Sequence, residues 1–282
     1  MIFVSSASLK NKNINKVLSN FKKNKILNVE LSGGTKFNQK LEKIILKYNK
    51  HMNFTVHNYF PPPKKDFILN LGSIDEKNRQ ESLKLCKKAL SICKKIKINK
   101  YAVHAPFLID FAPNEAGKLI KKRKLSSKKK VIDQFIKSWK ELKKVSGNVN
   151  LYLENNVLSY ENFKNFEYKN PFLCTDYKSY LELKRKVDFK ILLDFGHLFV
   201  SCKTLNKNFF KEAEKFTNLT DYFHISDNNG ISDENKGLNI KSEIFKFLKK
   251  KKIKKNSILT LEIYQNINII KKNIKIVSKL IK

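Results

Sequence analysis

Eight short apolar segments alternate along the chain with longer lysine-rich segments, in which hydrophobic residues recur every three or four positions. Short apolar runs are typical of buried strands in a parallel sheet. A spacing of three to four residues is typical of helices with one buried face, and Asn78–Lys95 and Val131–Lys144 are clear examples. The predicted strands are Ile2–Ser5, Ile26–Leu31, Asn53–His57, Tyr101–Ala105, Val149–Glu154, Phe189–Asp194, Tyr222–Ser226 and Ile258–Ile263.

The regular alternation of strand and helix predicts parallel βα units, and eight such units predict a closed (β/α)₈ TIM barrel of the α/β class. Because no linker and no internal repeat divides the sequence, we expect residues 1–282 to form a single domain.

Three stretches depart from the repeat. Tyr59–Asp66 contains three consecutive prolines, which exclude a helix or a central strand and predict a loop over the barrel mouth. Lys118–Lys130 is densely basic and is expected to be a solvated helix or a mobile loop rather than a binding patch. Phe172–Thr175 is a ninth apolar piece, which we interpret as an elaboration between the fifth and sixth strands.

Composition favours a protein with a sizeable core, since 41% of the 282 residues are hydrophobic. No apolar run approaches the roughly 18 residues of a membrane helix. Met1–Ala7 carries no basic leader and is predicted to contain the first strand, so a cytoplasmic protein is expected. The four cysteines form no Cys-x-x-Cys pair; Cys86 and Cys93 lie on a helical pattern, which favours buried thiols over disulfides or zinc ligands.

The formal net charge of +34 raises the possibility of nucleic-acid binding. Nearly all of the positive charge is lysine, however, and the chain has just three arginines, Arg79, Arg123 and Arg185. Arginine is the residue that recognises bases and phosphates through two parallel hydrogen bonds. Lysine, asparagine and isoleucine are abundant throughout, which we interpret as AT-rich coding. The charge permits an anionic ligand such as a sugar phosphate without selecting one.

Histidines and acids cluster at the ends of predicted strands. Each alone is more often a buried polar group with a local partner, and Asp194 alone is also typical of an Asp-capped turn after a strand. Together they indicate a metal site, because the carboxyl ends of barrel strands meet at one pocket and burying many ionisable groups without a cation is costly. The residues are His57, His104, Glu154, Asp194, His197, His224 and Glu262.

Carboxylate and imidazole ligands without a thiolate suit Zn²⁺, Mn²⁺, Co²⁺ or Fe²⁺. Glu154, Asp194, His224 and Glu262 make a plausible single centre. The remaining histidines can bind a second ion or contact substrate.

Five strand endings together resemble the xylose-isomerase-like TIM-barrel superfamily. They are His104–Phe107, Leu153–Asn155, Leu193–His197, His224–Asp227 and Leu261–Ile263. The superfamily includes sugar isomerases, sugar-phosphate isomerases and epimerases, and apurinic endonucleases of the endonuclease IV type. In the isomerase and epimerase branch, the resemblance implies a divalent metal held by Glu154, Asp194, His224 and Glu262, with the two glutamates moving a substrate proton.

The endonuclease branch is similar in other segments, His57–Tyr59 and Ile68–Ser73. Its trinuclear zinc site would also include Asp233, but the family's Asp-x-His pair is here Asp233-Glu234-Asn235. Asn235 is a poor replacement for a zinc-binding imidazole. The family's Asp-Thr-Cys-His is also changed, to Asp-Phe-Gly-His at 194–197. The expected zinc positions are His57, His104, Glu154, Asp194, His197, His224, Asp233 and Glu262.

The sequence therefore predicts a metal-dependent isomerase or epimerase that acts on a sugar or sugar phosphate by proton transfer next to a carbonyl. The alternatives are an endonuclease IV-like enzyme that cleaves DNA at abasic sites, for which nucleic acid would be the partner, and a barrel that binds a ligand without catalysis. The sequence leaves the oligomeric state open.

Overall fold

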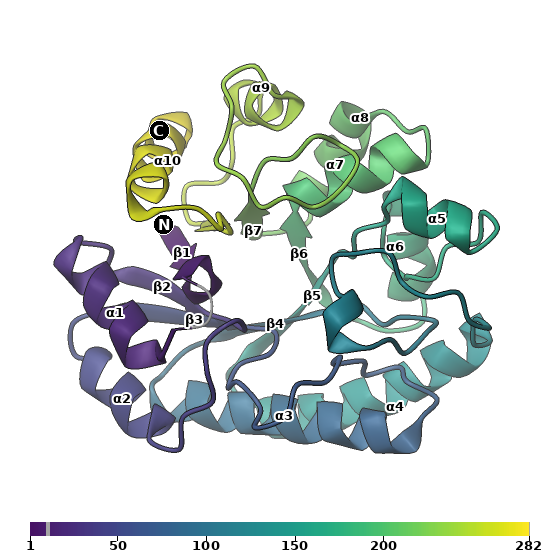
Figure 1. The fold of residues 1–282 in the computed structure, drawn as a ribbon, viewed down its shortest axis with the longest axis horizontal. Coiled ribbons are helices and arrows are strands. Elements are labelled where there is room, and N and C mark those ends of the chain that lie inside the picture. Colours follow the sequence, from purple (N-terminus) through teal and green to yellow (C-terminus); the bar gives the residue numbers. More distant parts are fainter. Residues whose placement is uncertain (10–11, 282) are drawn as a thin grey trace.

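The computed structural model describes residues 1–9 and 12–281. It contains a closed barrel of eight parallel strands enclosed by helices (Figure 1). Strands adjacent in sequence are adjacent in space, and β1 closes the barrel by pairing with β8. This is the predicted (β/α)₈ TIM barrel. The strands are β1 (Ile2–Ser5), β2 (Asn28–Leu31), β3 (Asn53–His57), β4 (Lys100–His104), β5 (Asn150–Glu154), β6 (Lys190–Asp194), β7 (Tyr222–Ile225) and β8 (Ile258–Leu261).

Each predicted strand is confirmed, and its ends differ from the prediction by at most two residues. The largest differences occur where the apolar run continues past the backbone pairing. Ile26 and Ile263 are buried at 4% and 0% exposure, yet they lie outside β2 and β8. Hydrophobicity indicates burial and not backbone hydrogen bonding, so an apolar run can be longer than the strand that it contains.

The helices form the outer layer of the barrel (Figure 1). Helix α3 begins at Glu76, before the predicted start at Asn78, because the Asp75 side chain accepts a hydrogen bond from the Lys77 amide and caps the helix. The helices are α1 (Ile14–Lys23), α2 (Leu41–Tyr48), α3 (Glu76–Lys95), α4 (Lys128–Ser146), α5 (Tyr160–Asn165), α6 (Tyr177–Lys184), α7 (Phe195–Thr204), α8 (Phe209–Thr217), α9 (Glu243–Lys250) and α10 (Ile267–Leu280), with short 3₁₀ turns at Ser6–Leu9 and Pro113–Glu115.

The hydrophobic core has three parts. The largest lies between the strands and the helix layer and includes Trp139 of α4 and Phe21 of α1. A second is built from loops at the carboxyl ends of the strands and includes Phe107 and Phe172. The third fills the barrel interior as a packed layer, as is usual for this fold. Its members are Phe3, Ala102, Tyr152, Leu192, Tyr222 and Ile258.

The irregular stretches lie where loops follow strands. Tyr59–Asp66 forms a loop, as predicted, and several of its residues line a cavity at the barrel mouth. The basic run Lys118–Lys130 is divided: its first part is an extended loop, and α4 begins at Lys128. Phe172 bridges to Phe107, after which Asp176 caps α6.

The four cysteines are free and buried, as the sequence predicted. Among the described residues, no helix combines the length and hydrophobicity needed to cross a membrane. A cytoplasmic location stays a prediction.

Candidate metal centre

Four of the candidate ligands occupy barrel positions two residues beyond the interior apolar layer. Side chains alternate between the two faces of a strand, so a residue two positions after an interior residue also points into the barrel. Glu154 therefore follows Tyr152 on the interior face of β5, and Asp194 follows Leu192 in the same way on β6. The same relation holds for His104 after Ala102 and for His224 after Tyr222.

The four predicted primary ligands lie together. Glu154, Asp194, His224 and Glu262 each offer an atom within 4.8 Å of the others. Nδ1 of His224 lies 3.0 Å from Glu154 Oε1, 3.5 Å from Glu262 Oε2 and 3.8 Å from Asp194 Oδ2. Glu154, Asp194 and His224 are fully buried, and Glu262 is 5% exposed. One imidazole nitrogen thus faces three carboxylates.

The two carboxylate oxygens of Asp194 have different roles. Oδ1 accepts a hydrogen bond of 2.7 Å from the His197 amide and caps α7, which is the local role that the sequence also allowed. Oδ2 is buried and has no hydrogen-bond partner among the described residues. The turn needs Gly196, because a Cβ there would lie 2.6 Å from Ser226 Oγ and 3.2 Å from Asp194 Oδ1. The strand-to-helix turn therefore leaves one carboxylate oxygen free to face the centre.

Three further histidines surround Glu154. Nε2 of His57 lies 2.7 Å from Oε2, and Nδ1 of His104 lies 3.3 Å from the same oxygen. Nδ1 of His197 lies 3.7 Å from Oε1. These three histidines line a cavity of about 660 Å³ at the barrel mouth, and Glu262 lines it with them. The three histidines thus line one cavity, and their role there stays a prediction.

Asp233 and Asn235 belong to the same cavity. An Asp233 oxygen lies 3.3 Å from Nε2 of His197. Asn235 stands on the cavity wall with a left-handed backbone (φ 47°), and its carbonyl accepts a hydrogen bond from the Tyr264 amide. The structure thus places an amide where the endonuclease pattern requires an imidazole.

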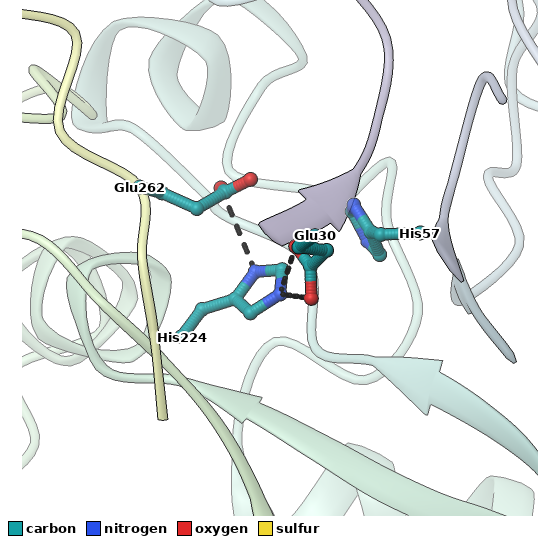
Figure 2. Close-up of side chains that lie close together, drawn as sticks. All are labelled: Glu30, His57, His224 and Glu262. Atoms are coloured by element: carbon teal, nitrogen blue, oxygen red, sulfur yellow. Dashed lines mark hydrogen bonds and ion pairs between the residues drawn. The ribbon is translucent and has the colours of Figure 1, made fainter. Parts of the chain in front are cut away.

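Glu30 is a site residue that the sequence reasoning missed. It lies in β2, is fully buried, and its carboxylate is 3.0 and 3.2 Å from His224 Nε2. Figure 2 shows His224 between Glu30 and Glu262, with His57 beside Glu30. Tyr222 and Thr260 also donate hydrogen bonds to Glu30, the latter at 2.9 Å. A charged residue inside an apolar strand was the available signal, since an unpaired charge would not be buried there.

The electrostatics of the cluster follow from this crowding. Burial, reinforced by the nearby Glu154 and Asp233 carboxylates, raises the pKa of Asp194 to about 7, although His197 acts in the opposite direction. Burial alone would lower the pKa of His224, but the Glu30, Glu262 and Glu154 carboxylates outweigh it and raise that pKa well above its usual value. The carboxylates therefore need positive charge near them.

The residues fit a divalent metal ion. Three carboxylates and one imidazole converge, and a buried Asp194 oxygen that faces them has no hydrogen-bond partner within the described residues. Oxygen and nitrogen donors of this kind suit Zn²⁺, Mn²⁺ or Co²⁺, and a cation would relieve the repulsion between the acids. Which residues bind metal stays a prediction.

Fold and site together define a TIM barrel with a buried carboxylate and imidazole cluster at the carboxyl ends of its strands. The chain belongs to the xylose isomerase-like TIM barrel family, whose model matches residues 27–280. A search of curated proteins finds no significant match.

Solved structures share the whole fold. The chain is similar to a D-tagatose 3-epimerase-like protein, with 17% identity, a TM-score of 0.69 and coverage of 99% of this chain and 98% of that one. It is also similar to D-psicose 3-epimerase from Clostridium cellulolyticum, with 12% identity, a TM-score of 0.66 and coverage of 100% of this chain and 99% of that one. Endonuclease IV from Thermus thermophilus is similar too, with 10% identity, a TM-score of 0.63 and coverage of 99% of this chain and 98% of that one. At these identities the likeness shows the fold alone.

Proposed function

We propose that this protein is a divalent-metal-dependent isomerase or epimerase of a sugar or sugar phosphate. We also propose that residues 1–282 form a single domain. The observation that supports this most is the convergence of Glu154, Asp194, His224 and Glu262 within 4.8 Å, beneath a cavity of about 660 Å³. Pockets of a few hundred Å³ hold small molecules. Lys36 and Lys64 also line this cavity and would suit an anionic group such as a phosphate.

When bound, the metal would act as a Lewis acid on the sugar carbonyl and its adjacent hydroxyl. Glu262 lines the cavity, so its carboxylate is placed to remove the proton from the carbon next to the carbonyl. Glu154 is fully buried beneath His57 and His104, which hold its Oε2. Glu154 or a water would return the proton. Return to the opposite face of the same carbon would give the epimer, and return to the original face would give back the starting sugar.

Phosphodiester hydrolysis at abasic DNA is a second candidate. It is favoured by one observation, the presence of His57, His104, His197 and Asp233 around the same cavity. Asn235 argues against it, because an amide oxygen binds zinc less well than imidazole does. The scarcity of arginine also disfavours recognition of phosphates in DNA.

The test is proton exchange. Purified protein loaded with Mn²⁺, Co²⁺ or Zn²⁺ is incubated in D₂O with a panel of ketohexoses and their phosphates, and loss of the carbon-bound proton is followed by NMR. We expect exchange with at least one sugar, and we expect Glu262→Gln to reduce it by roughly 100-fold or more, as for loss of a general base.

The matched control is Glu243→Gln, a glutamate on the surface of α9. It should exchange at the rate of the unaltered protein, and circular dichroism should show the same fold for all three proteins. Full activity of Glu262→Gln would remove that residue from the mechanism. Metal-loaded protein that exchanges no sugar but cleaves an abasic duplex would instead establish the hydrolytic function.

A further inference from the structure

A second cavity, of about 340 Å³, adjoins the cavity over the candidate metal centre. The two share lining residues, among them His104, His197, Asp233, Tyr59 and Ile68. The two cavities are therefore neighbours, and a ligand that spans them would pass His104, His197 and Asp233. The proposed isomerisation makes no use of this space.

Three phenylalanines form the wall of the second cavity. The ring of Phe107 lies 5.5 Å from that of Phe111 and 5.6 Å from that of Phe172, measured between centroids. Phe107 lies in the loop after β4 and Phe172 in the segment between α5 and α6, and their backbones form an isolated antiparallel bridge. The Phe107 ring is 6.4 Å from the His104 ring. The aromatic wall thus begins directly beside the candidate metal centre.

Two exposed aliphatic side chains line the same cavity. Leu119, in the loop after β4, is 57% exposed, and Ile231, in the loop after β7, is 59% exposed. A single exposed leucine or isoleucine is ordinary on a protein surface. Two of them on separate loops, lining one cavity together with aromatic rings, indicate a surface that an apolar group covers.

The loop that carries Leu119 is held in place by hydrogen bonds. The Ile120 amide donates to Asn162 Oδ1 at 2.9 Å, and Asn165 Nδ2 donates to the Ile120 carbonyl at 2.7 Å. Glu115 accepts hydrogen bonds from the Lys121 amide and from the Arg123 guanidinium. The cavity wall is therefore preformed, which lowers the entropy cost of binding a ligand against it.

We propose that the second cavity binds an apolar, preferably aromatic, group attached to the sugar, so that the substrate is a sugar derivative that keeps a free carbonyl and carries an aryl or alkyl substituent, such as an aryl or alkyl ketoglycoside. This inference rests on the proposed function. The Phe107, Phe111 and Phe172 rings offer no hydrogen-bond partner to a hydroxyl group, so this wall favours an apolar substituent over a hydroxylated one. The volume suffices for a ring, since a cavity of about 150 Å³ already holds benzene. Ser159, Asn162 and Ser232 also line it and can bond the few oxygens of a linkage.

The experiment uses hydroxamates as probes, because their two adjacent oxygens stand in for the carbonyl and hydroxyl oxygens that a sugar would present to the metal. Calorimetry on the Mn²⁺-loaded full chain compares acetohydroxamate with phenylalkyl hydroxamates whose chains have one to three methylenes. We expect the best phenyl compound to bind at least about tenfold more tightly than acetohydroxamate, as burial of an aromatic ring would give.

Phe111→Ser and Leu119→Ser should each reduce this gain while leaving the affinity for acetohydroxamate unchanged. Leu219→Ser is the matched control, since Leu219 is 47% exposed and lies outside both cavities. Absence of any gain from the phenyl group, or a gain that both cavity variants keep, would overturn the inference and leave the proposed function standing. Failure of acetohydroxamate itself to bind would refute the metal centre and this inference with it.

Discussion

Glu30 lies behind His224, on the side of the imidazole opposite the three acids of the candidate metal centre. Its Oε1 is 3.0 Å from Nε2, whereas Nδ1 faces Glu154 at 3.0 Å and Glu262 at 3.5 Å. A carboxylate in this position holds the proton on Nε2, so the Nδ1 lone pair points to where a metal would bind. The hydroxyl of Thr260 fixes the carboxylate in turn.

Glu30→Gln should therefore weaken metal binding without unfolding the barrel. Loss of a carboxylate that orients a histidine ligand typically costs about 10- to 100-fold in metal affinity. The measurement is a competition titration with a chromophoric chelator, together with the visible spectrum of bound Co²⁺, which reports ligand geometry. A change in the spectrum would not follow from a general loss of stability.

Glu212→Gln provides a control at a buried glutamate of α8, which bonds the Tyr177 amide and Lys215 away from the metal centre. It should bind metal as the unaltered protein does. Equal affinity and an unchanged cobalt spectrum in Glu30→Gln would show that His224 needs no such partner.

Strand positions and most of the site could be predicted because both follow from periodicity. A buried strand fixes which side chains face the barrel, and strands β3 to β7 each place a histidine or acid at or near the carboxyl end. Glu30 was missed although it stands one residue before the end of β2, the same place that His224 holds in β7. Its partner His224 is 194 residues away in sequence.

No sequence pattern joins Glu30 to His224, because β2 and β7 come near each other only when β1 pairs with β8 and closes the barrel. The loops were harder still to predict. The lysine-rich run was expected to be solvated, but the amides of Ile120 and Lys121 donate to Asn162 and Glu115, which lie outside that run. Composition cannot reveal such side chain to backbone bonds, whereas the apolar period reveals the strands directly.

Metal removal should lower the thermal stability of the protein, and Asp194→Asn should abolish that effect. A ligand at 100 times its Kd stabilises the folded state by about 2.7 kcal/mol. At roughly 2 °C per kcal/mol for a chain of this size, chelation should lower the Tm by roughly 5 °C. Differential scanning fluorimetry with and without chelator measures this shift.

The Asp194→Asn protein should retain the cap of α7, because an asparagine Oδ1 can still accept the hydrogen bond from the His197 amide. It also removes one of the crowded acids, so its metal-free Tm should equal or exceed that of the unaltered protein. A metal-free Tm well below the unaltered value would mean that Asp194 serves the fold more than the metal. A full metal-induced shift in the variant would exclude Asp194 as a ligand.

Glu115 should stabilise the loop after β4 in a pH-dependent way. Hydrogen bonds from the Ala112 and Lys121 amides, together with the Arg123 guanidinium, lower the pKa of Glu115 to about 2. A carboxylate whose pKa is lower in the folded state contributes stability above its ordinary pKa near 4.5, and this contribution is lost as pH falls towards 2.

Glu115→Gln should therefore have a lower Tm than the unaltered protein at pH 7, and the difference should shrink between about pH 4.5 and pH 2. Thermal unfolding at about pH 7, 4 and 3 measures it, with Glu42→Gln on the surface of α2 as the control. A difference that stays constant over this range would show that the carboxylate charge of Glu115 is not what holds the loop.

Asn235 separates the two candidate functions. In the endonuclease arrangement a third zinc ion needs His197, Asp233 and a second histidine, and in this chain an asparagine occupies that last place on the cavity wall. The amide oxygen is a weak zinc ligand, so the third ion should be absent or weakly bound. Without it, less positive charge is available to stabilise the phosphate during cleavage.

We therefore expect negligible cleavage of an abasic-site duplex by the zinc-supplied protein. The assay needs moderate salt, because a chain with a net charge of +34 would bind DNA non-specifically at low ionic strength. Asn235→His tests the same residue in the other direction. If this variant cleaves the duplex and elemental analysis finds one more zinc ion per chain, the asparagine at this position is what prevents hydrolysis in the unaltered protein. If the unaltered protein instead cleaves the duplex at a rate that Asn235→His does not increase, the missing imidazole does not matter for the reaction. Hydrolysis would then become the better supported function.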